Sequence, residues 1–178
     1  MEESHTKSHD IAQLLAAFFI RHFSQQKEIE DIITTFNKWF PSSSREKILK
    51  EYVAFQVASM VMAIAAHFDD SGEGGNIAVE FSTKFGEYLV QTGIFQSVFE
   101  YHAFVDPRVS NYWLASERDE GNGLDPVYWR GKEACKNFSE TEKDLHLANV
   151  MAVAKIFHED LIANADFLHE LSHQSNAS

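Results

Sequence analysis

Residues 57–66 read VASMVMAIAA, and this stretch decides the fold. Wound as an α-helix, it is apolar on every side, whereas a helix at a protein surface keeps one polar face. The longest apolar run, Val53 to Ala66, is about 14 residues long and includes Gln56 and Ser59, so it is shorter than the ~20 residues that cross a bilayer. We therefore expect a central helix, ending near Phe68, that other helices surround.

Apolar residues recur at the three-and-four spacing of a helical face on both sides of this centre. We expect Ser43 with Glu46, and Ser139 with Glu142, to form capping boxes at helix starts. The three prolines are expected between helices, because proline removes a helical hydrogen bond. The further predicted helices cover residues 10–23, 29–40, 77–102 with a break at Gly93, and 139–172.

These patterns predict an all-α, single-domain helical bundle of five to six helices over residues 1–178, with flexible tails at 1–8 and 174–178. Residues 102–138 are expected to form a long irregular connection, because this segment contains Pro107, Pro126 and the turn-rich run Glu120 to Gly123. Such long connections in compact domains are often functional.

Two aromatic pairs occur in this connection, and tyrosine and tryptophan are enriched in interface hot spots. The connection also contains arginines, which favour the same use. The sequence thus predicts a recognition surface, and the alternative is that the rings fold back into the core. The candidate binding residues are Tyr112, Trp113, Tyr128, Trp129, Arg118 and Arg130.

The chain is acidic, with 27 acidic and 15 basic residues and a formal charge of −12. This charge would repel phosphates and anionic lipid surfaces, so neither a nucleic-acid nor a membrane partner is expected. The first twenty residues carry Glu2, Glu3 and Asp10 and do not resemble a signal peptide, which favours the cytoplasm. Cys135 is the single cysteine, so we expect a buried thiol and no intrachain disulfide.

His169-Glu170-Leu171-Ser172-His173 matches the H-E-x-x-H pattern, in which two histidines one helical turn apart bind zinc. No third ligand follows it, because the pattern lies five residues from the last residue, Ser178. The pattern makes His169 and His173 candidate zinc ligands. The alternative is that they are polar residues at a solvated helix end.

Residues 69–80 form a glycine-rich acidic stretch between two predicted helices. This stretch resembles an EF-hand calcium loop, and the resemblance implies weak calcium binding because a second loop to pair with is missing. The alternative is a simple interhelical turn. The candidate ligands, at loop positions one, three, five, seven and twelve, are Asp69, Ser71, Glu73, Gly75 and Glu80.

The chain contains no glycine-rich phosphate loop after a strand, no nucleophile elbow and no paired cysteine ligands. Enzymatic activity is therefore unsupported. We expect a non-enzymatic helical module that binds a protein or regulates one, with an unidentified partner. The first alternative is a protein that binds a divalent metal ion, calcium or zinc. The second is a protein that binds small apolar ligands, because the residues that line such a pocket have the same sequence pattern as a core.

Overall fold

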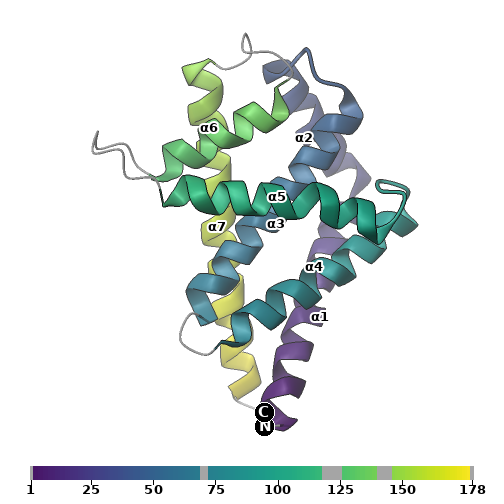
Figure 1. Cartoon of the computed structure of the whole chain (residues 1–178), viewed down its shortest axis with the longest axis vertical. Coiled ribbons are helices and arrows are strands. Elements are labelled where there is room, and N and C mark those ends of the chain that lie inside the picture. The colour runs from purple at the N-terminus through teal and green to yellow at the C-terminus, as the bar shows by residue number, and fades with distance from the viewer. Residues whose placement is uncertain (1, 69–71, 118–125, 140–145, 177–178) are drawn as a thin grey trace. The chain divides into compact units, whose positions relative to one another are not determined.

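A computed structural model describes residues 2–68, 72–117, 126–139 and 146–176, with side chains from Ser8 to Leu171 inside these ranges. The described residues form seven α-helices and no strand (Figure 1). The predicted all-α helical bundle is therefore confirmed, with more helices than the five to six expected. The helices are α1 (Glu2–Ser24), α2 (Gln26–Trp39), α3 (Arg45–Phe68), α4 (Glu73–Gln91), α5 (Val98–Ser116), α6 (Pro126–Phe138) and α7 (Leu147–Asn176).

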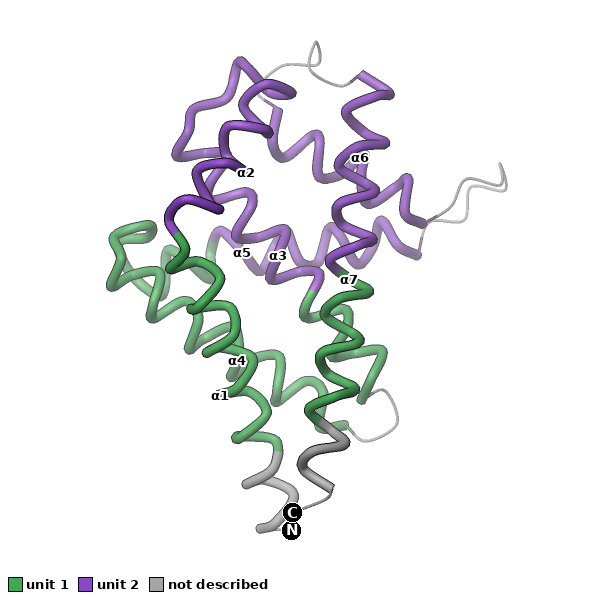
Figure 2. The backbone as a smooth tube through the Cα atoms, turned by 180° about the vertical axis from the view of Figure 1, so that it is seen from behind, with its two compact units in different colours: residues 1–25, 60–103, 161–178 green, residues 26–59, 104–160 purple. Residues whose placement is uncertain are grey.

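The chain divides into two compact units, which Figure 2 distinguishes by colour. Unit 1 comprises residues 1–25, 60–103 and 161–178, and unit 2 comprises residues 26–59 and 104–160. The borders fall inside α3, α5 and α7, so each of these helices contributes residues to both units. Each unit therefore has its own core, built from segments that are far apart in the sequence.

The core of unit 2 is largely aromatic. Phe55 of α3 packs edge-on against Phe157 of α7, with ring centroids 4.7 Å apart, and against Tyr112 of α5 at 6.1 Å. Phe138 lies between α2 and α3, 4.6 Å from Phe36 and 6.2 Å from Phe55. Edge-to-face pairs of this kind contribute about 0.5–1.5 kcal/mol beyond the burial of their area. The high phenylalanine content thus stabilises a specific packing.

The core of unit 1 joins α1 to α4. Phe19 packs edge-on against Phe81 and Phe85, with centroids 4.9 and 5.3 Å apart, and Phe23 lies 5.1 Å from Phe85. All four rings are buried. Their positions along α1 and α4 follow the spacing of a helical face, which is why the sequence pattern predicted these two helices.

The apolar stretch 57–66 lies inside α3, where most of it is buried, Val61 and Ala65 are half-buried and Ala66 is exposed. Residues 51–60 are all buried, which is unusual for ten consecutive helical residues and requires neighbours on every side. By length and composition, α3 alone among the described helices could cross a membrane, but 72% of its most apolar window is buried within the protein. A core helix of a bundle has this property.

Two helix ends have their backbone groups satisfied by local motifs. At the start of α3 the Ser44 hydroxyl accepts a hydrogen bond from the Lys47 amide at 3.2 Å, so Ser44 is the cap and the predicted Ser43 is not. After α4, Gly93 adopts a φ of 78°, and the amides of Gly93 and Ile94 donate to the carbonyls of Val90 and Leu89. This Schellman motif confirms the predicted break at Gly93.

The prediction of a long irregular connection over residues 102–138 is wrong. Two helices, α5 and α6, occupy most of it. Pro107 lies inside α5 instead of between helices, whereas Pro126 is the first residue of α6, where its missing amide proton carries no penalty. Proline has a low intrinsic helix propensity, but the packing of α5 against its neighbours outweighs this preference at Pro107.

The start of α7 differs from expectation. Residues 2–8 and 174–176, which we expect to be flexible tails, belong to α1 and α7. The last helix begins at Leu147, so Ser139 does not start it, and Glu142 of the predicted capping box lies outside the described residues. Instead the Ser139 carbonyl accepts a hydrogen bond from the Lys47 ammonium at 2.9 Å, which joins α3 to the end of α6.

Candidate functional site on helix α5

Helix α5 starts at a side-chain cap that the sequence analysis overlooked. The Ser97 hydroxyl accepts a hydrogen bond from the Glu100 amide at 3.1 Å, and the Glu100 carboxylate accepts one from the Gln96 amide at 2.7 Å. A serine followed three residues later by glutamate is a known start signal, so Ser97 and Glu100 could have revealed this helix.

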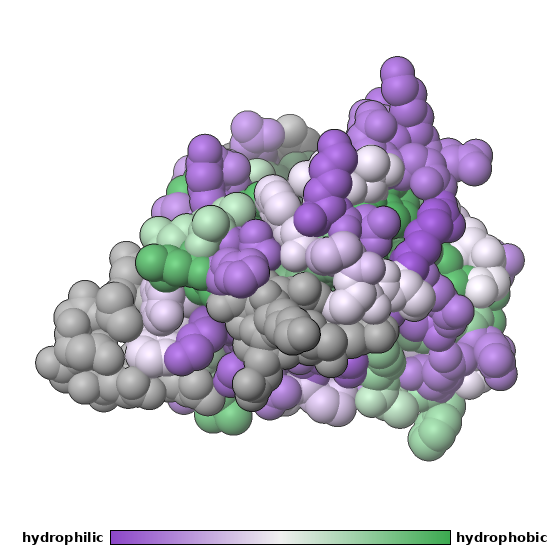
Figure 3. All heavy atoms as spheres, turned by 90° about the horizontal axis from the view of Figure 1, so that it is seen from above, coloured by the Kyte–Doolittle hydropathy of each residue, from purple (hydrophilic) through white to green (hydrophobic). Residues whose placement is uncertain are grey.

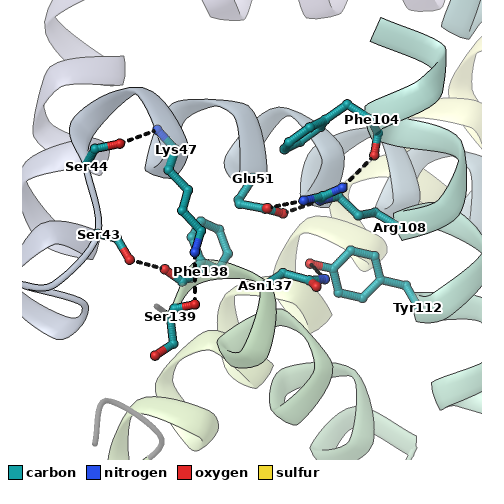
Figure 4. Close-up of polar contacts among 10 residues, drawn as sticks. All are labelled: Ser43, Ser44, Lys47, Glu51, Phe104, Arg108, Tyr112, Asn137, Phe138 and Ser139. Carbon is teal, nitrogen blue, oxygen red and sulfur yellow. Dashed lines mark hydrogen bonds and ion pairs between the residues drawn. The ribbon is translucent and has the colours of Figure 1, made fainter. Parts of the chain in front are cut away.

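In unit 2 the inner face of α5 is joined to α3 by a buried ion pair (Figure 4). Arg108 donates from Nε and Nη2 to the two carboxylate oxygens of Glu51, at 2.6 and 2.5 Å, and from Nη1 to the Phe104 carbonyl at 2.9 Å. The Glu51 side chain is 1% exposed and that of Arg108 is 24% exposed. This bidentate geometry fixes the rotation of α5 about its own axis.

Burial raises the pKa of Glu51 above its usual value, while the hydrogen bonds and charge of Arg108 act in the opposite direction. The carboxylate is therefore poorly solvated and depends on Arg108 for its charge. Both of its oxygens accept from Arg108, and the group is almost fully enclosed. This arrangement is suited to holding helices together and unsuited to proton transfer with a substrate.

One turn further along α5, Tyr112 joins the same helix to α6. Its hydroxyl accepts a hydrogen bond from Nδ2 of Asn137 at 3.3 Å, and burial raises its pKa, so the hydroxyl stays protonated. The inner face of α5 is thus held to α3 by Arg108 and to α6 by Tyr112 (Figure 4). In a separate contact, the Ser43 hydroxyl donates to the Phe138 carbonyl and connects the loop before α3 to the end of α6.

Arg130 of α6 adds a further contact with α5. The side chain is buried, its guanidinium lies 5.4 Å from the centroid of the Phe157 ring, and Nη1 donates to the Ser116 hydroxyl at 3.5 Å. The neighbouring Trp129 is also buried, and the Lys132 ammonium lies 4.8 Å from its ring centroid. Both side chains therefore belong to the packing of α6.

The opposite side of α5 faces solvent. Trp113 is 40% exposed and Leu114 is 58% exposed, and the Trp113 indole donates from Nε1 to the Glu117 carboxylate at 2.7 Å, which orients its ring. We call this surface the α5 outer face. Its members, all exposed and all in unit 2, are Asp106, Pro107, Ser110, Trp113 and Leu114.

Comparisons of the chain with protein-family models, with curated proteins and with solved structures gave no match.

The five predicted binding residues that the structure describes do not form one surface. The structure buries Tyr112, Trp129 and Arg130, leaves Tyr128 half-buried and exposes Trp113, while Arg118 lies outside the described residues. For two of the four rings, Tyr112 and Trp129, the alternative that the rings fold back as core holds. Tyr112 and Trp113 separate because adjacent helical residues point about 100° apart, so on α5 Tyr112 faces the core of unit 2 while Trp113 faces solvent.

The predicted EF-hand-like loop is not formed. Helix α4 begins at Glu73, so Glu73, Gly75 and Glu80 lie on a helix, whereas Asp69 and Ser71 lie outside the described residues. Seven helical residues span about 10 Å, too far for Glu73 and Glu80 to share an ion. The Glu80 carboxylate instead contacts His9 and the Lys84 ammonium. The helix forms because the apolar face of Ile77, Phe81 and Phe85 is buried, and this packing outweighs the loop pattern of the glycine-rich start.

The other predicted metal residues are partly described. His169 is exposed on α7, and the side chain of His173 lies outside the described part. In that part, no group of three or more His, Cys, Asp or Glu side chains is placed to hold an ion. Cys135 is buried as predicted, and burial raises the pKa of its thiol to about 12, so it remains an unreactive thiol.

A second carboxylate in unit 2, half-buried, belongs to Asp160 of α7 and accepts a hydrogen bond from Nε2 of Gln56 at 2.5 Å. Burial raises its pKa to about 6, although the bond from Gln56 lowers it. The raised pKa means that folding favours the protonated form. The stability it contributes is therefore present below about pH 4 and lost as the pH rises through 6.

Asp160→Asn should accordingly match the wild type in stability at pH 4 and exceed it by about 1 kcal/mol at pH 7.5, after allowing for partial solvent screening. Asparagine keeps an oxygen that can accept from Gln56 and removes the buried charge. Urea unfolding at both pH values measures the effect. Asp166→Asn, at an exposed position of the same helix, is the control and should change stability little at either pH. A pH-independent difference for Asp160→Asn would contradict the assignment.

Proposed function

We propose that this protein is a non-catalytic binding module whose α5 outer face docks onto another protein. The observation that carries the proposal is the exposure of Trp113 and Leu114 side by side on a helix whose inner face is fixed by Arg108 and Tyr112. A rigid helix that already holds its tryptophan ring in place loses little conformational entropy on binding. Exposed tryptophan at the centre of such a surface is the usual anchor of a hot spot.

The acidic charge of the protein indicates which charge a partner would carry. Asp106 on this face and Glu117 beside it are exposed and acidic, and the whole chain carries a formal charge of −12. Figure 3 shows the protein from above, and on this face hydrophilic side chains project between smaller apolar areas. A partner that fits the α5 outer face would present apolar side chains bordered by lysine or arginine. Its association should weaken with salt, because exposed charges are screened.

The test places a photo-crosslinking phenylalanine analogue at Ser110 of the full-length chain and irradiates it in a lysate of the cells that produce it. We expect one dominant crosslinked protein, whose yield falls when purified wild-type protein is added as a competitor. The competitor Leu114→Glu should be at least about tenfold less effective, because it places an unpaired charge in the apolar centre of the interface. The matched control is Val79→Glu, at a position 67% exposed on α4, which should compete like the wild type.

Equal competition by Leu114→Glu and the wild type would contradict the proposal, provided that circular dichroism shows both to be folded. A crosslink between two copies of this chain would identify the partner as a second copy, and the yield should then follow the same order of competitors. Saturable turnover of a substrate by the purified protein, lost on a point substitution, would overturn the non-catalytic assignment.

A further inference from the structure

Two histidines that are far apart in the sequence meet in unit 1. His67 lies in the last turn of α3, and His169 lies in the C-terminal part of α7. Their ring centroids are 6.4 Å apart, the ring planes cross at 77°, and both residues are exposed. The H-E-x-x-H pattern pairs His169 with His173, so the structure supplies a partner on a different helix.

We infer that His67 and His169 together form a site for a first-row divalent metal ion that prefers imidazole nitrogen, with Zn²⁺ as the type case. Zinc binds imidazole nitrogen at about 2.0–2.1 Å, so an ion lies roughly 3 Å from the ring centroid and two ligating rings lie about 5–6 Å apart. The observed separation of 6.4 Å is slightly wider. Rotation about the side-chain torsions of two exposed histidines closes this difference.

The chemistry of the site follows from its ligands. Neutral imidazole suits Zn²⁺, Cu²⁺ and Ni²⁺, whereas Ca²⁺ and Mg²⁺ require oxygen ligands. Among the described side chains no third histidine, cysteine or carboxylate is placed to complete a cluster with these two. Two protein ligands hold an ion more weakly than the four of a closed structural site.

Binding at this site has a structural consequence, because the ion would connect the end of α3 to the end of α7. A ligand that binds only the folded protein raises its stability by an amount that grows with the logarithm of the ratio of free ligand concentration to Kd. An ion held by one histidine, or by two on the same helical turn, makes no such link between the two helices. The melting temperature therefore checks the affinity that the binding isotherm gives.

The experiment titrates ZnCl₂ into the untagged full-length protein by calorimetry and measures melting temperature with and without zinc. We expect one saturable site and a rise in melting temperature. His67→Ala and His169→Ala should each weaken binding by about tenfold or more and remove the rise, since each leaves a single ligand. The double variant, which has neither ligand, should show no binding at this site. His158→Ala, at an exposed position of α7, is the matched control and should bind zinc like the wild type.

Two results would overturn the site. If His67→Ala bound zinc as tightly as the wild type while His173→Ala did not, the ligands would be the pair on α7 alone. If the wild type showed no saturable binding up to about 1 mM zinc, neither pair would form a site. Circular dichroism without zinc checks that each variant is folded, and His67→Gln replaces His67→Ala if the alanine variant is not.

Discussion

Replacing Arg108 by alanine should lower the free energy of unfolding by about 3 kcal/mol at pH 8, because it leaves the Glu51 charge buried without its partner. At pH 5 the loss should be clearly smaller. Without Arg108 the pKa of Glu51 in the folded protein rises further, so at low pH the carboxyl group takes up a proton and the buried charge is removed. Urea unfolding at the two pH values measures both losses.

Two further variants isolate the cause. Glu51→Gln combined with Arg108→Ala should be more stable at pH 8 than Arg108→Ala alone, because glutamine carries no charge to bury. Arg45→Ala breaks an ion pair with Glu30 that is exposed on both sides, and it should change stability by less than about 0.5 kcal/mol. A loss for Arg108→Ala no larger than that for Arg45→Ala would show that the buried pair does not hold α5 in place.

Replacing Gly131 by alanine should destabilise the protein by about 3 kcal/mol or more, although alanine is the better helix former. A Cβ atom at this position of α6 would lie 2.4 Å from the Ala154 Cβ, 2.6 Å from the Val150 carbonyl oxygen and 2.9 Å from the Ala154 Cα. Two of these are backbone atoms of α7, which cannot rotate away. The two helices would have to separate, and the core of unit 2 would lose contacts.

The matched control for this prediction is Gly75→Ala on α4. A Cβ at Gly75 meets no atom within 4 Å, so the substitution should stabilise the protein by about 0.5–1 kcal/mol through helix propensity alone. Adding Ala154→Gly to Gly131→Ala should recover only part of the loss, because the carbonyl of Val150 remains in the way. Equal stability of Gly131→Ala and the wild type in urea unfolding would mean that α6 and α7 are not packed at this distance.

The fold class was predictable because it depends on local patterns. The uniformly apolar run at residues 57–66 requires surrounding helices wherever it occurs in a chain. Gly93 marked a helix end for a similarly local reason, since its left-handed φ is one that other residues rarely adopt. Pro107 misled the prediction, because proline lowers helix propensity and the packing of α5 outweighs that local preference.

The candidate site was predictable only in part. The pairs Tyr112-Trp113 and Tyr128-Trp129 drew attention to the segment that contains α5 and α6, but the sequence alone does not tell which member of a pair is buried. Leu114 was missed because a single exposed leucine has the same pattern as a core residue. Glu51 was missed because a glutamate at the edge of an apolar stretch is ordinarily a solvated helix residue, and its burial depends on Arg108.

The sequence by itself determined an acidic, all-α chain with a central apolar helix, because helix formation and amphipathic spacing involve residues three or four positions apart. Only the tertiary structure decided that Arg108 binds Glu51, that α6 approaches α7 at Gly131 and that His67 lies beside His169. Each of these contacts joins residues on different helices. Their identity depends on how the helices pack and rotate against one another, which no short sequence interval encodes.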